Sequence, residues 1–125
     1  MDPKQNDATT RTLPLVFSCS GAADVGAICD QAARQLSRDG AAAMSCIAGV
    51  SANVEPILNA VKSAASVLAL DGCPQDCVAK TLIASGHKPS AHVRLSDLGM
   101  NKKESPLTDE RVRQVLSAAK EALES

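Results

Sequence analysis

Short apolar runs alternate with helical patterns along most of this chain, and this alternation restricts its fold more than any other feature. The apolar runs at 13–18, 41–47, 66–70 and 92–95 are short enough to be buried strands. Strands that alternate strictly with helices form βαβ units around a parallel sheet. We therefore predict a three-layer α/β fold. Its sheet is mostly parallel, with about four strands in the order 2-1-3-4, and helices cover both faces.

The helical segments between these runs carry recognisable start signals and apolar faces. Apolar side chains recur from Val25 to Leu36 at helical spacing and give one continuous face. Pro56 fits the first turn of a second helix, where its missing N–H costs nothing. A third helix is predicted around 78–83. The last helix is predicted to begin after Thr108, a residue that favours the N-cap position.

The length of 125 residues predicts one domain, spanning 13–125, and the polar segment 1–12 is predicted to be a disordered tail. The net charge of −1 and the aromatic content of 1% predict no nucleic-acid partner. No apolar signal segment opens the sequence, and no run approaches the roughly 20 apolar residues of a membrane span. We therefore expect a cytoplasmic protein without a membrane partner.

Four of the five cysteines stand where predicted strands end. Cys19 and Cys46 close the first and second strands, and Cys73 and Cys77 follow the third. The carboxyl ends of parallel strands meet at one edge of the sheet, which is where α/β proteins bind ligands. Grouped cysteines in a reducing compartment indicate metal binding or redox chemistry. Four thiolates can complete the tetrahedral shell of Zn²⁺, so we predict one zinc ion held by these cysteines.

The spacing within the last pair suggests how the third helix contributes. If Cys73 stands at the helix start with Pro74 in the first turn, Cys77 lies one turn later on the same face. A helix N-terminus also stabilises a thiolate. Cys29, in contrast, lies on the apolar stripe of the first helix, where cysteine behaves as a small hydrophobic residue. We therefore place Cys29 in the core and exclude it from the site.

Other uses of the same cysteines stay open. Cys19 or Cys73 could be a reactive thiol that forms a disulfide or persulfide, and an iron–sulfur cluster also takes four thiolates. The loop after Cys19 is similar to that of low-molecular-weight tyrosine phosphatases, which need an arginine six residues after the nucleophile. Val25 occupies that position here. We assign no catalytic residue and expect a protein that is not an enzyme.

Three polar residues near these motifs are not expected to be metal ligands. Asp71 is expected to bond the amides of its turn or to accept a hydrogen bond behind the ligands. His87 and His92 are expected to lie in solvent, away from the cysteine edge.

The segments CSGAADVG (19–26), MSCIAGV (44–50) and LALDGCPQDCVAKTL (68–82) occur in this order, and HVRLSDLG (92–99) follows. Together they resemble the DGC domain family, small bacterial and archaeal proteins described as zinc-binding from four recurring cysteines. The tripeptide Asp71-Gly72-Cys73 gives the family its name. The resemblance implies that Cys19, Cys46, Cys73 and Cys77 are the metal ligands. It implies no particular activity, because the family's biochemical role is largely unassigned.

Overall fold

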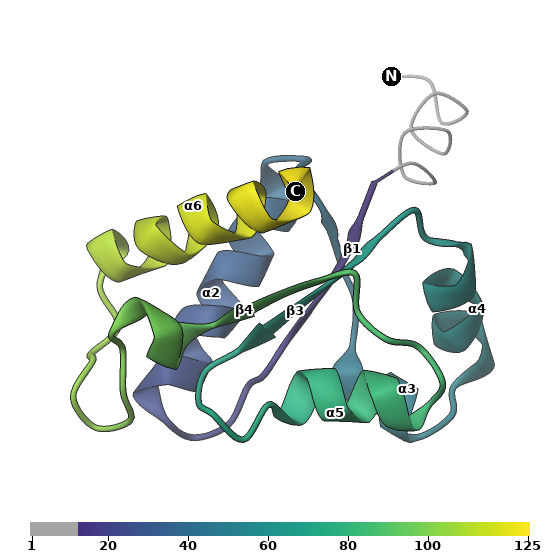
Figure 1. Ribbon diagram of the computed structural model, residues 1–125, viewed down its shortest axis with the longest axis horizontal. Coiled ribbons are helices and arrows are strands. Elements are labelled where there is room, and N and C mark those ends of the chain that lie inside the picture. Colours follow the sequence, from purple (N-terminus) through teal and green to yellow (C-terminus); the bar gives the residue numbers. More distant parts are fainter. Residues whose placement is uncertain (1–12) are drawn as a thin grey trace.

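The sheet is parallel and has the predicted strand order. A computed structural model describes residues 13–125, so the prediction of a disordered tail at 1–12 lies outside the described residues. The strands are β1 (Leu15–Ser18), β2 (Ala43–Met44), β3 (Val67–Asp71) and β4 (Ala91–Arg94). They pair in the order β2-β1-β3-β4, and each neighbouring pair is parallel (Figure 1). This confirms the predicted α/β fold.

Helices cover both faces of the sheet. They are α2 (Asp24–Arg38), α3 (Ile47–Ser51), α4 (Glu55–Ser63), α5 (Cys77–Ala84), the 3-10 turn η1 (Leu95–Leu98) and α6 (Asp109–Glu124). Helices α2 and α6 pack together on one face, while α3, α4 and α5 lie on the other (Figure 1). Among residues 13–125, no helix combines the length and the hydropathy that crossing a membrane requires.

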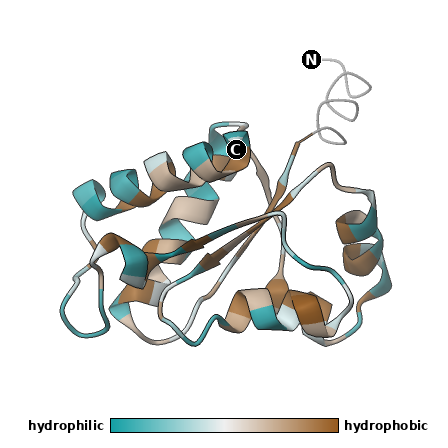
Figure 2. Ribbon diagram, in the orientation of Figure 1, coloured by the Kyte–Doolittle hydropathy of each residue, from teal (hydrophilic) through white to brown (hydrophobic). Residues whose placement is uncertain are grey.

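Alternation along the strands divides the core into two clusters. Val16 and Leu68 face α2 and α6, whereas Phe17 and Ala69 face the opposite helices, and all four are fully buried. Successive side chains of a strand point to opposite faces, so both faces of β1 and β3 must be apolar. Figure 2 shows these central strands mostly hydrophobic and the outer side of α6 mostly hydrophilic.

Two local signals, at Pro56 and Thr108, act as the sequence predicts. Pro56 lies in the first turn of α4, and the Thr108 hydroxyl caps α6 by accepting a hydrogen bond from the Arg111 N–H at 3.1 Å. Gly86 follows α5 with a φ of +92°, the left-handed conformation that glycine adopts most readily after a helix.

Two predicted boundaries are wrong. Strand β2 has only two residues because the predicted 41–47 run enters α3, which begins directly after Cys46. Helix α5 begins at Cys77, so Cys73 and Pro74 lie in the preceding turn and not on a helical face. The start of α5 is instead set by Asp71, whose carboxylate accepts hydrogen bonds from backbone N–H groups of its first turn.

Candidate functional site

Three of the four predicted cysteines line one cleft at the carboxyl edge of the sheet. Cys19 follows β1, Cys73 lies in the turn after β3, and Cys77 begins α5. All three line a cleft of about 560 Å³. Cys46 does not line it, although the next residue, Ile47, does, and the Cys46 side chain is exposed. The structure therefore gathers three of these residues and leaves the fourth beside them.

Glycines allow the loops of this cleft to approach one another closely. A Cβ atom on Gly26 would lie 3.0 Å from the backbone N and O atoms of Gly21. A Cβ atom on Gly72 would lie 2.9 Å from Val25 Cγ2 and 3.1 Å from its carbonyl carbon. Larger residues would force these segments apart. The glycines thus bring the turn after β3 against the start of α2, beside Cys19.

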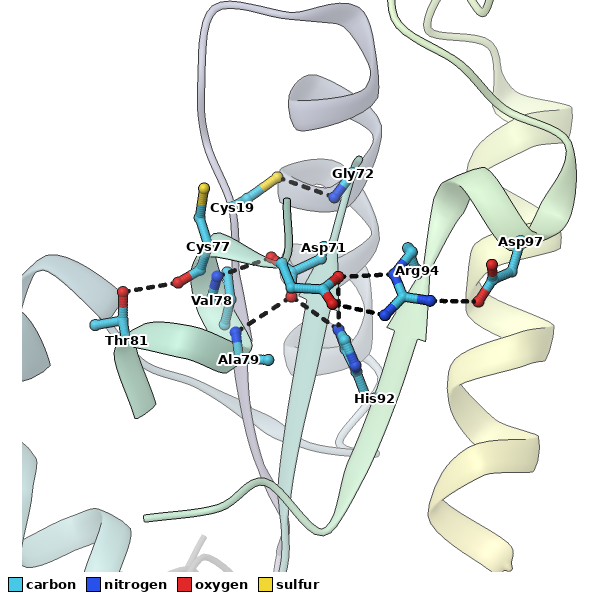
Figure 3. A network of polar contacts seen from close by, with 11 residues as sticks. Cys19, Asp71, Gly72, Cys77, Val78, Ala79, Thr81, His92, Arg94 and Asp97 are labelled. Atoms are coloured by element: carbon cyan, nitrogen blue, oxygen red, sulfur yellow. Dashed lines mark hydrogen bonds and ion pairs between the residues drawn. The ribbon is translucent and has the colours of Figure 1, made fainter. Parts of the chain in front are cut away.

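Hydrogen bonds stabilise the negative charge of a Cys19 thiolate. Its Sγ accepts a hydrogen bond from the Gly72 N–H at 3.3 Å (Figure 3). The pKa of Cys19 is lowered to about 7, chiefly by a hydrogen bond from the Cys29 thiol and then by the Gly72 and Gly21 N–H groups. Partial burial and the negative charge of Asp71 oppose this shift. A substantial thiolate population at neutral pH follows.

Cys29 has a second role that the sequence analysis missed. It is fully buried in the core, as predicted. Its hydrogen bond with Cys19, followed by burial, raises the pKa of the Cys29 thiol far above its ordinary value, so Cys29 stays protonated and acts as the donor. The helical spacing held a usable signal, because Cys29 lies one turn after Val25, which packs beside Gly72.

Asp71 is a buried acceptor that joins β3 to α5 and β4. Its side chain accepts hydrogen bonds from the Val78 N–H at 2.8 Å and the Ala79 N–H at 3.2 Å, and His92 Nε2 lies 2.8 Å from its Oδ2 (Figure 3). Asp71 is 1% exposed. His92 is an exposed residue, as predicted, but its side chain is 27% exposed and its contact with Asp71 was not predicted. The neighbouring-strand position of His92, opposite Ala69 in the register, explains this contact.

Arg94 holds the turn that connects Cys73 to Cys77. Its guanidinium donates to both carboxylate oxygens of Asp76, at 2.7 and 2.6 Å. Its third contact, which Figure 3 shows, is Asp97 at 3.2 Å. These Arg94 hydrogen bonds hold the pKa of Asp76 below its usual range. Asp76 has a φ of +56°, an uncommon conformation for a residue other than glycine. The two-point ion pair therefore fixes a strained turn between the two cysteines.

The donor chemistry suits zinc, but the sulfur positions do not form a ready-made zinc shell. Zn–S distances of about 2.3 Å require thiolates roughly 3.8 Å apart. Within residues 13–125, the one group of three ligand-type side chains whose donor atoms lie within 4.8 Å of one another is Asp71, Asp76 and His92. Those carboxylates already bind Arg94 and the start of α5. The four-cysteine zinc site therefore stays a prediction.

Comparison with known proteins shows the family of this chain. The model of the DGC domain matches residues 15–119. The chain belongs to the DGC domain family. A curated relative, the anaerobic and virulence modulator AnvM of Pseudomonas aeruginosa strain PAO1, is 41% identical over 91 residues, which cover 73% of this chain and 70% of AnvM. No solved structure matches the chain. In this DGC protein, the motif Asp71-Gly72-Cys73 forms the end of β3 and the wall of the cysteine cleft.

Proposed function

We propose that this DGC protein is a thiol-based redox regulator in which Cys19 is the reactive thiolate and Cys73 or Cys77 its partner. One observation carries the proposal: cysteines from two adjacent strand ends line the same cleft. Cys19 is partly exposed there, and its sulfur accepts a hydrogen bond from the Gly72 N–H. Reactive thiols occur in partly exposed settings of this kind, whereas structural cysteines are buried and inert.

The chemistry is thiol–disulfide exchange with a small disulfide. The Cys19 thiolate attacks one sulfur of that disulfide, a new S–S bond forms, and the other half leaves as a thiolate. Cys73 or Cys77, as its thiolate, then attacks Cys19 Sγ in the mixed disulfide and releases the second half as a thiolate. The protein has lost two electrons to the small disulfide, which is now two thiols. A reductant of the same class reverses both steps.

The relative's name supports a regulatory use of this chemistry. AnvM is named an anaerobic and virulence modulator. Thiols that change state between reducing and oxidising conditions are suited to report the shift between anaerobic and aerobic life. The cytoplasmic location that we predict would keep the resting cysteines reduced.

The test compares Cys19→Ser with Cys46→Ser. Fully reduced protein is mixed with a chromogenic disulfide, and the fastest reacting thiol is identified by site-resolved mass spectrometry. We expect the fast phase to be lost in Cys19→Ser and retained in Cys46→Ser, because Cys46 does not line the cleft. A fast phase that survives Cys19→Ser would refute the proposal.

Zinc binding by Cys19, Cys46, Cys73 and Cys77 is a second candidate. The strand order favours it, because β2 and β3 flank β1 and the segments that follow these three adjacent strands carry all four thiols. Zinc there would order the loops and suppress the reactivity of the thiolates. An iron–sulfur cluster on the same ligands would give the protein visible absorption.

Cys46→Ser separates the two candidates. Metal analysis of anaerobically purified protein would find about one zinc ion per chain if all four cysteines are ligands, and Cys46→Ser would lose it. The thiol proposal requires the same variant to keep its Cys19 reactivity. Metal-free wild-type protein with a reactive Cys19 would support the thiol proposal and exclude the zinc site.

A further inference from the structure

The charges around the cysteine cleft are unevenly distributed. Lys102 is the one basic residue among the described residues that line the cleft, and Asp71 is the one acidic residue. Asp71 is 1% exposed, and its carboxylate is engaged by α5 and His92. Lys102 is exposed and also lines a smaller neighbouring cleft of about 270 Å³ beside Cys73. A molecule entering the cleft therefore meets an accessible positive charge, whereas the one negative charge of the lining is buried.

Lys102 belongs to a loop that is fixed in place. The Asp24 carboxylate, at the start of α2, accepts hydrogen bonds from the Lys103 N–H and the Ser105 N–H, both at 3.1 Å. The buried Ser105 hydroxyl accepts another from the Asn101 N–H at 2.9 Å. Lys103 has a φ of +71°, which residues other than glycine adopt only where their surroundings hold them. The loop thus presents Lys102 at the mouth of the cleft.

We infer that the cleft takes a small negatively charged disulfide and that Lys102 determines this preference. The inference rests on the proposed thiol function and names its reactant class. A cleft of about 560 Å³ has the size of a small-molecule site. Its walls at Gly21, Ala22 and Ala23 are small and carry no charge, so Lys102 supplies the electrostatic selection. An anionic group would lie against Lys102 while the sulfur of the reactant approaches Cys19.

Two alkylating probes of nearly equal size measure this selection. Iodoacetate is anionic and iodoacetamide is neutral, and both react with the same Cys19 thiolate, so the ratio of their rates cancels changes in thiol pKa. Lys102→Gln is compared with Lys103→Gln, which removes the same charge from a neighbouring side chain that does not line the cleft. The rates are taken at low salt from the Cys19 peptide.

We expect Lys102→Gln to lower the iodoacetate-to-iodoacetamide rate ratio about two- to fourfold, the effect of one charge about 5–8 Å away in water. Lys103→Gln should change the ratio less, and high salt should lower the wild-type ratio toward that of Lys102→Gln. An unchanged ratio in Lys102→Gln, or an equal fall in both variants, would overturn the inference. A Cys19 that reacts slowly with both probes would instead show that the proposed function fails.

Discussion

Replacing Cys29 by alanine tests how the buried thiol controls the reactive one. The substitution removes the S–H donor from Cys19 without adding charge, and it deletes one fully buried sulfur atom. We expect a loss of stability of about 1 kcal/mol from the small cavity. The larger effect should be on Cys19, because the hydrogen bond from Cys29 is the main cause of its lowered pKa.

The size of that effect follows from the two pKa values. With a pKa of about 7, half of the Cys19 population is thiolate at pH 7. A complete return to the ordinary value of about 8.5 would leave about 3% thiolate at pH 7. Each thiolate would then be about five times more nucleophilic, since reactivity rises with thiol pKa. At full return, the alkylation rate should fall about threefold at pH 7 and about sixfold at pH 6, and it should rise above wild type beyond about pH 8.

The assay is the rate of iodoacetamide alkylation at Cys19 from pH 5.5 to 10, followed by site-resolved mass spectrometry. The two pH profiles should cross, a result that a merely loosened structure would not give. Cys29→Ser keeps a hydroxyl donor and should retain a midpoint closer to that of wild type. A wild-type midpoint near pH 8.5, or an unshifted midpoint in Cys29→Ala, would refute the assignment of Cys29 as the donor.

Three further substitutions and one control, Gly21→Ala, test the packing and polar contacts of the site by urea denaturation. Gly26→Ala should lower the free energy of unfolding by about 1–3 kcal/mol because its Cβ would press on the Gly21 backbone. The control Gly21→Ala places its Cβ in open space and should change the free energy of unfolding by less than about 0.5 kcal/mol. Equal effects of the two substitutions would contradict the close approach of Gly26 to Gly21. Asp71→Asn should cost about 2–3 kcal/mol, because an amide replaces a buried charged acceptor; a neutral result would argue against its role at α5. Arg94→Ala should lower the free energy of unfolding less than Asp71→Asn does, since the pair of Arg94 with Asp76 is partly exposed; a loss as large as that of Asp71→Asn would contradict this.

The fold was predictable because its signals are local and repeated. Both clusters of the core follow from strands that are apolar on two faces, and the capping role of Thr108 follows from its own side chain. The start of α5 was not predictable in this way. Pro74 is compatible with a helix start, but Asp71 reaches from β3 and bonds the amides of α5 directly, which moves the start to Cys77. That contact depends on tertiary structure.

Some features of the candidate site could also be predicted from the sequence, and others depend on tertiary structure. The convergence of Cys19, Cys73 and Cys77 follows from strand order and could be predicted. The pairing of Cys29 with Cys19 and the contact of His92 with Asp71 could not, since they depend on how α2 packs on the sheet and on the register of β4. The alternation of strands and helices determines neither the packing of α2 on the sheet nor the register of β4.

Mapping the oxidised cysteines tests most directly whether Cys19 is the reactive thiolate and Cys73 or Cys77 is its partner. Reduced, metal-free protein is treated with glutathione disulfide, an anionic disulfide, and its products are mapped by peptide mass spectrometry without reduction. We predict a first product with glutathione on Cys19, followed by a disulfide that joins Cys19 to Cys73 or Cys77 and the loss of two thiols per chain. Five intact thiols, or modification confined to the exposed Cys46, would contradict it.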